Sequence, residues 1–398
     1  MPGHAVRECR AETRGATLLS MTGAQFADLE RYDVVAPTAD DLALEDQLTS
    51  WFRAHGSVLV GFSGGVDSAY LACVAIDALG RDGVLTVIGR SASYPSEQWE
   101  RAREVARQFG VPVLEVSTDE VNDPRYAANP SNRCYFCKTE LWDTLVPLAR
   151  ERGLSVVVDG TNADDLSDHR PGARAATEHA VRSPLAELGF SKDAIRRLSR
   201  ERGIPTWSQP ASPCLSSRIP YGTAVTIERL RQVERAEAAL RAAGVVGDLR
   251  VRYHGDLARV EIAADTISDW LRPRSVATLI AAARSAGFDR VAIDARGFRS
   301  GSLNVLGGVV AEPLVRATSS PGEGDAGRLA DALRALNLEC DVEARARLAI
   351  VRLEGAMHGE AVRDAALRAR LADIARGQGF THLAIELLNA DDAAVHRD

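Results

Sequence analysis

The hydrophobic and polar positions of residues 41–159 follow two alternating periods. Apolar residues recur at the spacing of an α-helix in four segments: 41–55, 67–79, 96–109 and 138–151. Between them lie short apolar runs, rich in β-branched residues, that predict buried strands: 57–62, 84–88, 111–116 and 155–159. Strands that alternate with helices of this length indicate βαβ units. We therefore expect an α/β fold with a parallel, Rossmann-like sheet and helices on both faces.

Beyond a proline-containing break at 209–213, the pattern changes to a small α+β arrangement. Two predicted helices and three predicted strands follow: 226–243, 274–286, 249–253, 258–262 and 290–293. The tail repeats this region, because 257–262 resembles 348–353 at an offset of 91 residues and 287–293 resembles 379–385 at an offset of 92. We infer that one module is present twice; chance similarity in a sequence rich in Ala, Arg and Leu is the alternative.

These patterns predict four parts in the chain of 398 residues. Residues 1–40 form a mobile leader, 41–208 the α/β domain, 209–311 the first small α+β module and 312–398 its degenerate repeat. A chain of this length is typical of two or three domains.

The composition excludes several classes of protein. The net charge of −7, from 48 basic and 55 acidic residues, argues against a dedicated nucleic-acid-binding protein, and no apolar run is long enough to span a membrane. Six cysteines are too few for a disulfide scaffold, and the start of the chain carries no apolar core of a signal peptide. We expect a cytoplasmic protein without a membrane or nucleic-acid partner, and we also expect a homo-oligomer.

A glycine-rich loop carries the sharpest chemical signal. Ser63-Gly64-Gly65-Val66-Asp67-Ser68 follows a predicted strand and opens a predicted helix. Two glycines let the backbone approach an anion, and the N–H groups at the start of a helix point at it. Ser63 and Ser68 add hydroxyl donors, and Asp67 can hold a hydrated Mg²⁺ that bridges phosphates. No lysine follows the glycines, so this is not a Walker A loop.

A second polar turn follows the predicted strand at 155–159. It contains Gly160, Thr161, Asn162 and Asp164. In open parallel sheets, ligands bind outside the carboxyl ends of the strands. This turn and the glycine-rich loop should therefore converge on one ligand.

The glycine-rich loop resembles the S-G-G-x-D-S signature of the PP-loop ATP pyrophosphatase superfamily. Further motifs follow it in order: Arg182-Ser183-Pro184-Leu185, Pro205-Thr206-Trp207, Pro213-Cys214-Leu215-Ser216-Ser217-Arg218 and Gly297-Phe298-Arg299-Ser300-Gly301-Ser302-Leu303-Asn304. This series, from about 41 to 304, is similar to the ATP-dependent sacrificial sulfur transferases that mature the nickel-pincer cofactor of lactate racemase.

The resemblance implies a reaction. ATP, with Mg²⁺, adenylates a carboxylate of a pyridinium dicarboxylate mononucleotide, which is a small anionic substrate, and pyrophosphate is released. Sulfur then replaces AMP and gives a thiocarboxylate. The resemblance places Asp67, Cys214 and Arg218 in the catalytic machinery.

Three cysteines leave the source of the sulfur open. In part of the family the sulfur comes from the cysteine at the position of Cys214, which becomes dehydroalanine. Cys134 and Cys137 form a C-x-x-C, which suggests a metal, a cluster or a redox pair in a cytosolic protein. A branch of the family implies a third arrangement, in which Cys134, Cys137 and Cys214 hold a [4Fe–4S] cluster whose fourth iron presents a sulfide. We expect this branch; zinc and the sacrificial route are the alternatives.

Four arginines match the phosphate and carboxylates of such a substrate, because a guanidinium binds oxyanions in pairs. Arg218 follows Ser217 in the cysteine motif, Arg250 and Arg252 share one face of a predicted strand, and Arg299 lies in the closing motif. We expect Glu237 and Glu261 to order these arginines or a metal.

The repeat lacks this positive charge. At the offset of 91 residues, Arg250 and Arg252 correspond to Asp341 and Glu343, which would repel the same anion. We therefore expect 312–398 to cover a surface, mediate oligomerisation or regulate access, and a 1–311 fragment to keep ATP hydrolysis. A tRNA sulfurtransferase and a non-catalytic nucleotide-binding regulator are the alternatives for the whole chain.

Overall fold

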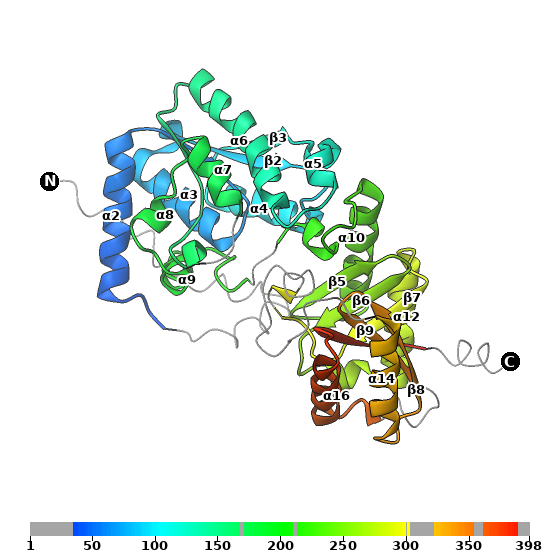
Figure 1. The fold of residues 1–398 in the computed structure, drawn as a ribbon. Coiled ribbons are helices and arrows are strands. Elements are labelled where there is room, and N and C mark those ends of the chain that lie inside the picture. The colour runs from blue at the N-terminus through cyan, green and yellow to red at the C-terminus, as the bar shows by residue number, and fades with distance from the viewer. Residues whose placement is uncertain are drawn as a thin grey trace. The chain divides into compact units, whose positions relative to one another are not determined.

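The chain forms two compact units, each built on one sheet (Figure 1). The computed structural model describes residues 35–167, 171–209, 213–299, 301–302, 322–353 and 361–388. The first unit falls within 1–120 and 132–212, and the second within 121–131 and 213–398. The segment 121–131 belongs to the second unit, and so do the residue ranges of both predicted small modules that the structure describes. The expected leader lies almost wholly outside the described residues.

The first unit contains a four-stranded parallel sheet in the order β3-β2-β1-β4, which confirms the predicted α/β fold. Its strands are β1 (Val58–Gly61), β2 (Val84–Arg90), β3 (Val113–Ser117) and β4 (Val156–Val158). Its helices are α2 (Ala39–His55), α3 (Val66–Leu79), α4 (Ser96–Gln108), α6 (Arg133–Glu151), α7 (Pro171–Glu178), α8 (Pro184–Glu187) and α9 (Lys192–Glu201).

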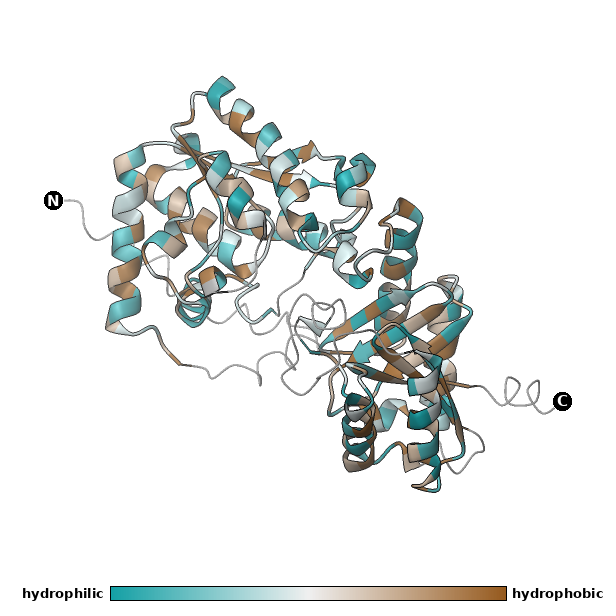
Figure 2. Cartoon of the chain, in the orientation of Figure 1, coloured by the Kyte–Doolittle hydropathy of each residue, from teal (hydrophilic) through white to brown (hydrophobic). Residues whose placement is uncertain are grey.

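Helices cover both faces of this sheet. Along β1, Val58 and Val60 belong to a hydrophobic core shared with α2, α3, α4 and α9. Leu59, between them, belongs to a different core with Trp142 and Leu145 of α6. This is the alternation expected for a strand buried on both sides. Figure 2 shows both hydrophilic and hydrophobic bands along α2. No described helix is long and apolar enough to cross a membrane.

The second unit contains a six-stranded mixed sheet in the order β5-β6-β7-β10-β9-β8. Its strands are β5 (Leu249–His254), β6 (Leu257–Ile262), β7 (Arg290–Asp294), β8 (Cys340–Arg345), β9 (Leu348–Leu353) and β10 (His382–Glu386). Its helices are α5 (Pro124–Ala127), α10 (Ile227–Ala242), α11 (Ile267–Trp270), α12 (Pro273–Ser285), α14 (Glu323–Arg334) and α16 (Ala365–Gly377).

The two halves of this sheet have the same connectivity. In each half a helix precedes an antiparallel hairpin, β5–β6 or β8–β9, and a second helix leads to a strand parallel to the hairpin's second strand. The hairpin registers agree residue by residue, because Leu249 pairs with Ile262 and Cys340, 91 residues later, pairs with Leu353. The halves join where β7 and β10 pair antiparallel. We refer to them below as the first copy (α10 to β7) and the second copy (α14 to β10).

Candidate functional site

The glycine-rich loop of the first unit is fixed in an open turn between β1 and α3. The hydroxyl oxygens of Ser63 and Ser68 lie 3.1 Å apart, and Ser68 donates to the carbonyl of Gly65 at 3.2 Å. Gly64 has a φ of +68°, and a Cβ there would lie 2.4 Å from the Cβ of Ala102, so only glycine fits. No side chain caps the start of α3 at Gly65. Its first N–H groups can therefore bind an anion.

The second polar turn packs directly against this loop. A Cβ at Gly160 would lie 2.9 Å from the backbone nitrogen of Ser68. The amide of Asn162, which is fully buried, donates to Asp67 Oδ1 at 3.2 Å. The hydroxyl of Thr161 donates to Asp159 at 3.0 Å, and Asp164 accepts from the backbone N–H of Lys192 at 2.7 Å. The two predicted nucleotide-binding segments thus meet, although Thr161 and Asp164 also hold the turn itself together.

Lys192 is a candidate residue that the sequence analysis did not identify. Its Nζ lies 3.8 Å from Asp67 Oδ2, at the start of α9. Burial raises the pKa of the Asp67 carboxyl, and the charge of Lys192 opposes this shift. The sequence does single out Lys192 in one way, because it is one of only two lysines in a chain rich in arginine.

The C-x-x-C occupies the first turn of α6, a helix that begins five residues before its predicted start. Cys134 is exposed and Cys137 is partly exposed. Residues three apart in a helix lie on the same side, so both thiols face one region. No disulfide joins any of the described cysteines.

Cys214 lies in the second unit, just before the short 3₁₀ helix η6 (Leu215–Arg218). Two arginines, Arg218 of the loop itself and Arg252 of β5, donate hydrogen bonds to carbonyl groups of this Cys214 loop (213–218). Arg218, which is 2% exposed, donates to the carbonyls of Pro213 and Cys214 at 2.6 and 3.1 Å. Arg252 donates to the carbonyl of Ser217 at 2.8 Å. The predicted anion-binding arginines therefore also position the cysteine loop.

Residues of the segment 121–131 also form hydrogen bonds with the Cys214 loop and with the residues that follow it. The hydroxyl of Tyr126 lies 2.5 Å from that of Ser216, and both residues are buried. The side-chain amide of Asn129 donates to three carbonyls that follow the loop, those of Ile219, Pro220 and Thr223. Sequence patterns gave no sign of this contact, because the partners lie about 90 residues apart.

The arginines of the second unit form a buried network with three carboxylates. Four arginines form its ion pairs, namely Arg218, Arg252, Arg259 and Arg299, and Arg250 lies close to Arg218. The ion pairs are Arg218–Glu237 at 2.9 Å, Arg252–Glu261 at 2.7 Å, Arg259–Glu261 at 3.0 Å, Arg259–Asp294 at 2.6 Å and Arg299–Asp294 at 3.0 Å. Burial raises the pKa of the Glu261 carboxyl, but Arg252 and Arg259 outweigh it and hold the pKa below its usual value.

Arg250 lies in the same cluster of charges, where Arg218 repels it and Glu237 and Asp248 attract it. It is 7% exposed, and its guanidinium lies over the ring of Phe298 at 5.3 Å. Burial, followed by repulsion from Arg218, lowers the pKa of Arg250 to about 10. An anion bound beside Arg250 would relieve this repulsion.

The expected site residues thus fall into two groups. The phosphate loop, its second turn and the C-x-x-C belong to the first unit, whereas the Cys214 loop, Arg250, Glu237, Glu261 and Arg299 belong to the second. Glu237 and Glu261 pair with arginines. Across the described ranges, no three His, Cys, Asp or Glu side chains gather as they would around a metal ion.

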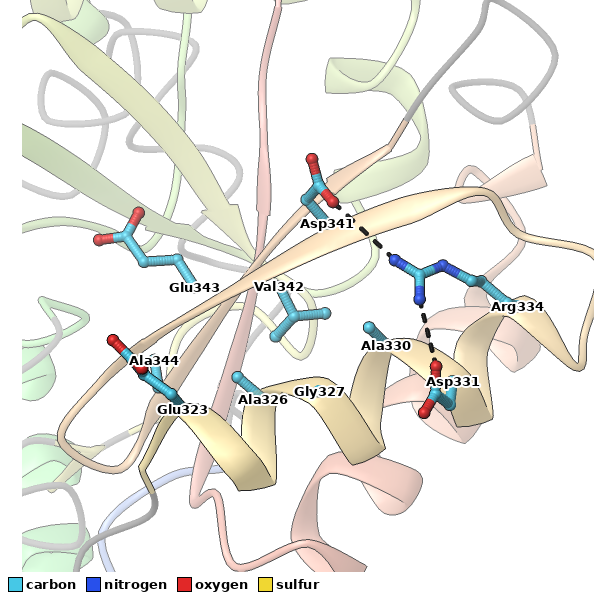
Figure 3. Close-up of a pocket in the computed structure, with 10 residues that line it drawn as sticks. All are labelled: Glu323, Ala326, Gly327, Ala330, Asp331, Arg334, Asp341, Val342, Glu343 and Ala344. Atoms are coloured by element: carbon cyan, nitrogen blue, oxygen red, sulfur yellow. Dashed lines mark hydrogen bonds and ion pairs between the residues drawn. The ribbon is translucent and has the colours of Figure 1, made fainter.

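A groove of about 550 Å³ lies in the second copy, between α14 and β8 (Figure 3). It is lined by Ala326, Gly327 and Ala330 of the helix, and by Asp341 and Glu343 of the strand. Arg334 reaches across one end to Asp331 and Asp341. None of the expected site residues lines this groove, and its acidic walls do not suit an anionic substrate.

Comparisons with known proteins add a family to this geometry. The NAD synthase family model matches residues 43–130. An uncharacterised protein of Synechocystis is 44% identical over 259 residues, which cover 65% of this chain and 96% of that protein. The pyridinium-3,5-bisthiocarboxylic acid mononucleotide synthase of Lactiplantibacillus plantarum is 37% identical over 249 residues, covering 62% of this chain and 88% of the enzyme. An uncharacterised protein of Methanocaldococcus jannaschii is 29% identical over 261 residues, or 65% and 97%. Each match leaves roughly a third of this chain without a counterpart.

Proposed function

As a member of the family of the pyridinium-3,5-bisthiocarboxylic acid mononucleotide synthase, the chain is an ATP-using sulfurtransferase of the PP-loop class, and we propose that it acts on a pyridinium dicarboxylate mononucleotide. A carboxylate oxygen attacks the α-phosphorus of ATP, and pyrophosphate leaves. A sulfur nucleophile then adds to the activated carbonyl carbon, AMP leaves with the carboxylate oxygen, and a thiocarboxylate remains.

The first unit supplies the binding of ATP. The uncapped start of α3 and the hydroxyls of Ser63 and Ser68 suit the phosphates. Asp67 suits a hydrated Mg²⁺, and Lys192 suits the phosphate charge that develops when pyrophosphate leaves.

The single observation that carries the proposed substrate is the excess of buried arginine beside the Cys214 loop. Four arginines form direct ion pairs with three carboxylates, and a fifth, Arg250, is repelled by Arg218 although Glu237 and Asp248 attract it. A phosphate or carboxylate would balance this charge. Because Arg250 and Arg252 are almost fully buried, the network suits a small anion better than the exposed backbone of a nucleic acid.

For the sulfur, we propose that Cys134, Cys137 and Cys214 act together. Two thiols on one side of a first helical turn fit two ligands of a [4Fe–4S] cluster, and Cys214 would be the third. Such a cluster would supply an iron site that binds sulfide. Transfer from Cys214 itself, which would leave dehydroalanine, is the alternative. Reduced thiols of this kind are typical of the cytoplasm.

The test is an anaerobic incubation with ATP, Mg²⁺ and the pyridinium dicarboxylate mononucleotide, followed by mass spectrometry. We expect exchange of oxygen for sulfur in the substrate and release of pyrophosphate. Asp67→Asn and Cys214→Ser should abolish the exchange. Cys340→Ser, which changes a buried cysteine of the second copy, is the matched control and should not. Pyrophosphate release without any sulfur in the substrate would contradict the proposed transfer.

The same experiment separates the two sulfur routes. Cluster-bound protein should be brown after anaerobic reconstitution, with up to about four irons per chain, and Cys134→Ser should remove the colour. Colourless active protein in which Cys214 becomes dehydroalanine during turnover would show the sacrificial route instead.

A further inference from the structure

One histidine of the second copy reaches into the charge network of the first. His382 begins β10 and is 3% exposed. Its Nε2 lies 3.1 Å from the hydroxyl of Ser302, which belongs to the closing motif that follows the first copy. A buried polar side chain costs free energy unless it is hydrogen-bonded. An apolar residue at this position of a core strand would avoid this free-energy cost. The hydrogen bond of His382 therefore points to a role beyond packing.

From Ser302, hydrogen bonds continue to the Cys214 loop. The hydroxyl of Ser302 donates to Glu261 Oε1 at 2.7 Å. Glu261 Oε2 accepts from Arg252 Nε at 2.8 Å. Arg252 Nη1 donates to the carbonyl of Ser217 at 2.8 Å. Four contacts thus link His382 to the backbone three residues after Cys214.

The direction of these hydrogen bonds fixes the form of the histidine. An ionised carboxylate only accepts hydrogen bonds, so the hydroxyl of Ser302 donates to Glu261. The oxygen of that hydroxyl then accepts from Nε2–H of His382. The Nδ1 atom then accepts from the hydroxyl of Thr381 at 2.9 Å. Burial, together with the charges of Arg259, Arg299 and Arg252, lowers the pKa of His382 well below its usual value. The ring is therefore neutral, and both nitrogens are used.

We propose that His382 is a positioning residue for the Cys214 loop, acting through Ser302, Glu261 and Arg252. The second copy thereby helps to set the geometry of Cys214, which precedes the first copy in the chain. The importance of Cys214 rests on the proposed function, but the positioning itself does not.

Alkylation of Cys214 measures this positioning without any sulfur transfer. The full chain, kept in chelator under anaerobic conditions, is treated with iodoacetamide, and the rates at Cys214 and Cys134 are compared by peptide mass spectrometry. Cys134 lies in the other unit, so its rate is an internal reference that local changes near His382 should not alter.

Two variants should release the loop. His382→Phe keeps an aromatic ring without the donor, and Ser302→Ala removes the central hydroxyl. We expect each to raise the ratio of Cys214 to Cys134 alkylation by about three- to tenfold, the range for one lost hydrogen bond. His382→Gln, whose amide can donate from the place of Nε2, should restore the wild-type ratio.

Arg352→Ala is the matched control. Arg352 stands at the position of Glu261 in the second copy and pairs with Glu386 instead. It should leave the ratio unchanged. An unchanged ratio in folded His382→Phe overturns the proposal; if that variant does not fold, an unchanged ratio in Ser302→Ala overturns it. Failure of the proposed function would appear in the sulfur-exchange assay and would not change these ratios.

Discussion

The two copies in the second unit share a backbone pattern and carry opposite charges. Arg250 and Arg252 on β5 stand where Asp341 and Glu343 stand on β8. Glu261 on β6 stands where Arg352 stands on β9. Strand pairing depends on backbone hydrogen bonds, so the charges on one face can be exchanged without changing the sheet. The comparison teaches that the sheet specifies the fold, whereas the charged face specifies the chemistry.

The helices that precede the two hairpins also differ, because a charged residue on one corresponds to a small apolar residue on the other. On α10, Glu237 pairs with Arg218 and fills the space above β5. The sequence match of 239–242 with 332–335 aligns Glu237 with Ala330 of α14, which lines the open groove over β8 (Figure 3). The first copy uses this space to hold the Cys214 loop, and the second leaves it unfilled.

Removal of 312–398 should have the largest effect on this comparison. β10 is buried along its whole length and pairs with β7 in the middle of the sheet. Leu383 and Ile385 alone contribute about 1.5–3 kcal/mol each by burial. We expect the 1–311 fragment to lose the folded second unit, while the first unit still binds ATP. Hydrogen exchange measures this: peptides of β5–β7 should lose protection and those of β1 and β2 should keep it. Native protection of β7 in the fragment would mean that the first copy folds alone.

Removal of one charge at equivalent positions should have unequal costs. Arg252→Ala leaves Glu261 buried with one arginine fewer, which should lower the free energy of unfolding by about 3–5 kcal/mol. Glu343, whose side chain is 40% exposed, should cost about 0–1 kcal/mol when replaced by alanine. Urea unfolding of the two variants measures the difference. Equal costs would show that burial does not distinguish the copies.

The pair Arg250 and Asp341 should separate binding from stability. Arg250→Ala removes a charge that burial and Arg218 disfavour, together with one hydrogen bond to the carbonyl of Leu249, so stability should fall by only about 1 kcal/mol. The KM for the mononucleotide should rise about 10- to 100-fold, as expected for a lost hydrogen bond to a charged group. Asp341→Ala should change neither quantity. Steady-state kinetics at saturating ATP measures this, and an unchanged KM in Arg250→Ala would remove Arg250 from the substrate site.

The smallest effect concerns pH. Burial lowers the pKa of both His254 and His382 well below 6.5. Above pH 6.5 neither the folded nor the unfolded state is protonated at these residues. Below it the unfolded state takes up protons that the folded state does not, so stability falls. Each histidine contributes up to about 1.4 kcal/mol per pH unit.

Urea unfolding at about pH 7.5 and about pH 5.5 measures this fall. The buried carboxylates Glu237, Glu261 and Glu386 have lowered pKa values, so their contribution is lost only at still lower pH. His382→Gln should remove about half of this decrease in the free energy of unfolding. A fall of the same size in that variant would assign it to other groups.

Most of the fold follows from local patterns in the sequence. The periodicities at 41–55, 226–243 and 274–286 predict helices that the structure confirms within two residues at each end. The start of α6 was missed, because Arg133-Cys134-Tyr135-Phe136-Cys137 has no apolar periodicity. The short helices α7 and α8 were missed for the same reason: with 8 and 4 residues, they are too short to show an apolar face by periodicity.

Much less of the candidate site follows from the sequence, because its partners are distant along the chain. Motifs identify Asp67, Cys214 and Arg218, but not what each of them contacts. Tertiary packing decides three of these contacts. Arg218 donates to carbonyls of its own loop, Asn129 donates to the residues that follow this loop, and Lys192 approaches Asp67. No residue pattern within one element encodes these contacts.

Arg290 on β7 has a consequence for how this chain can evolve. It forms ion pairs at 2.7 Å with both Glu343 and Glu386, two acids of the second copy. A lineage that discarded the second copy would leave Arg290 with the more distant Asp256, at 3.6 Å, and one that altered either acid would favour a compensating change at position 290. Among homologues that keep both copies, positions 290, 343 and 386 should covary. Selection then acts on the two copies together.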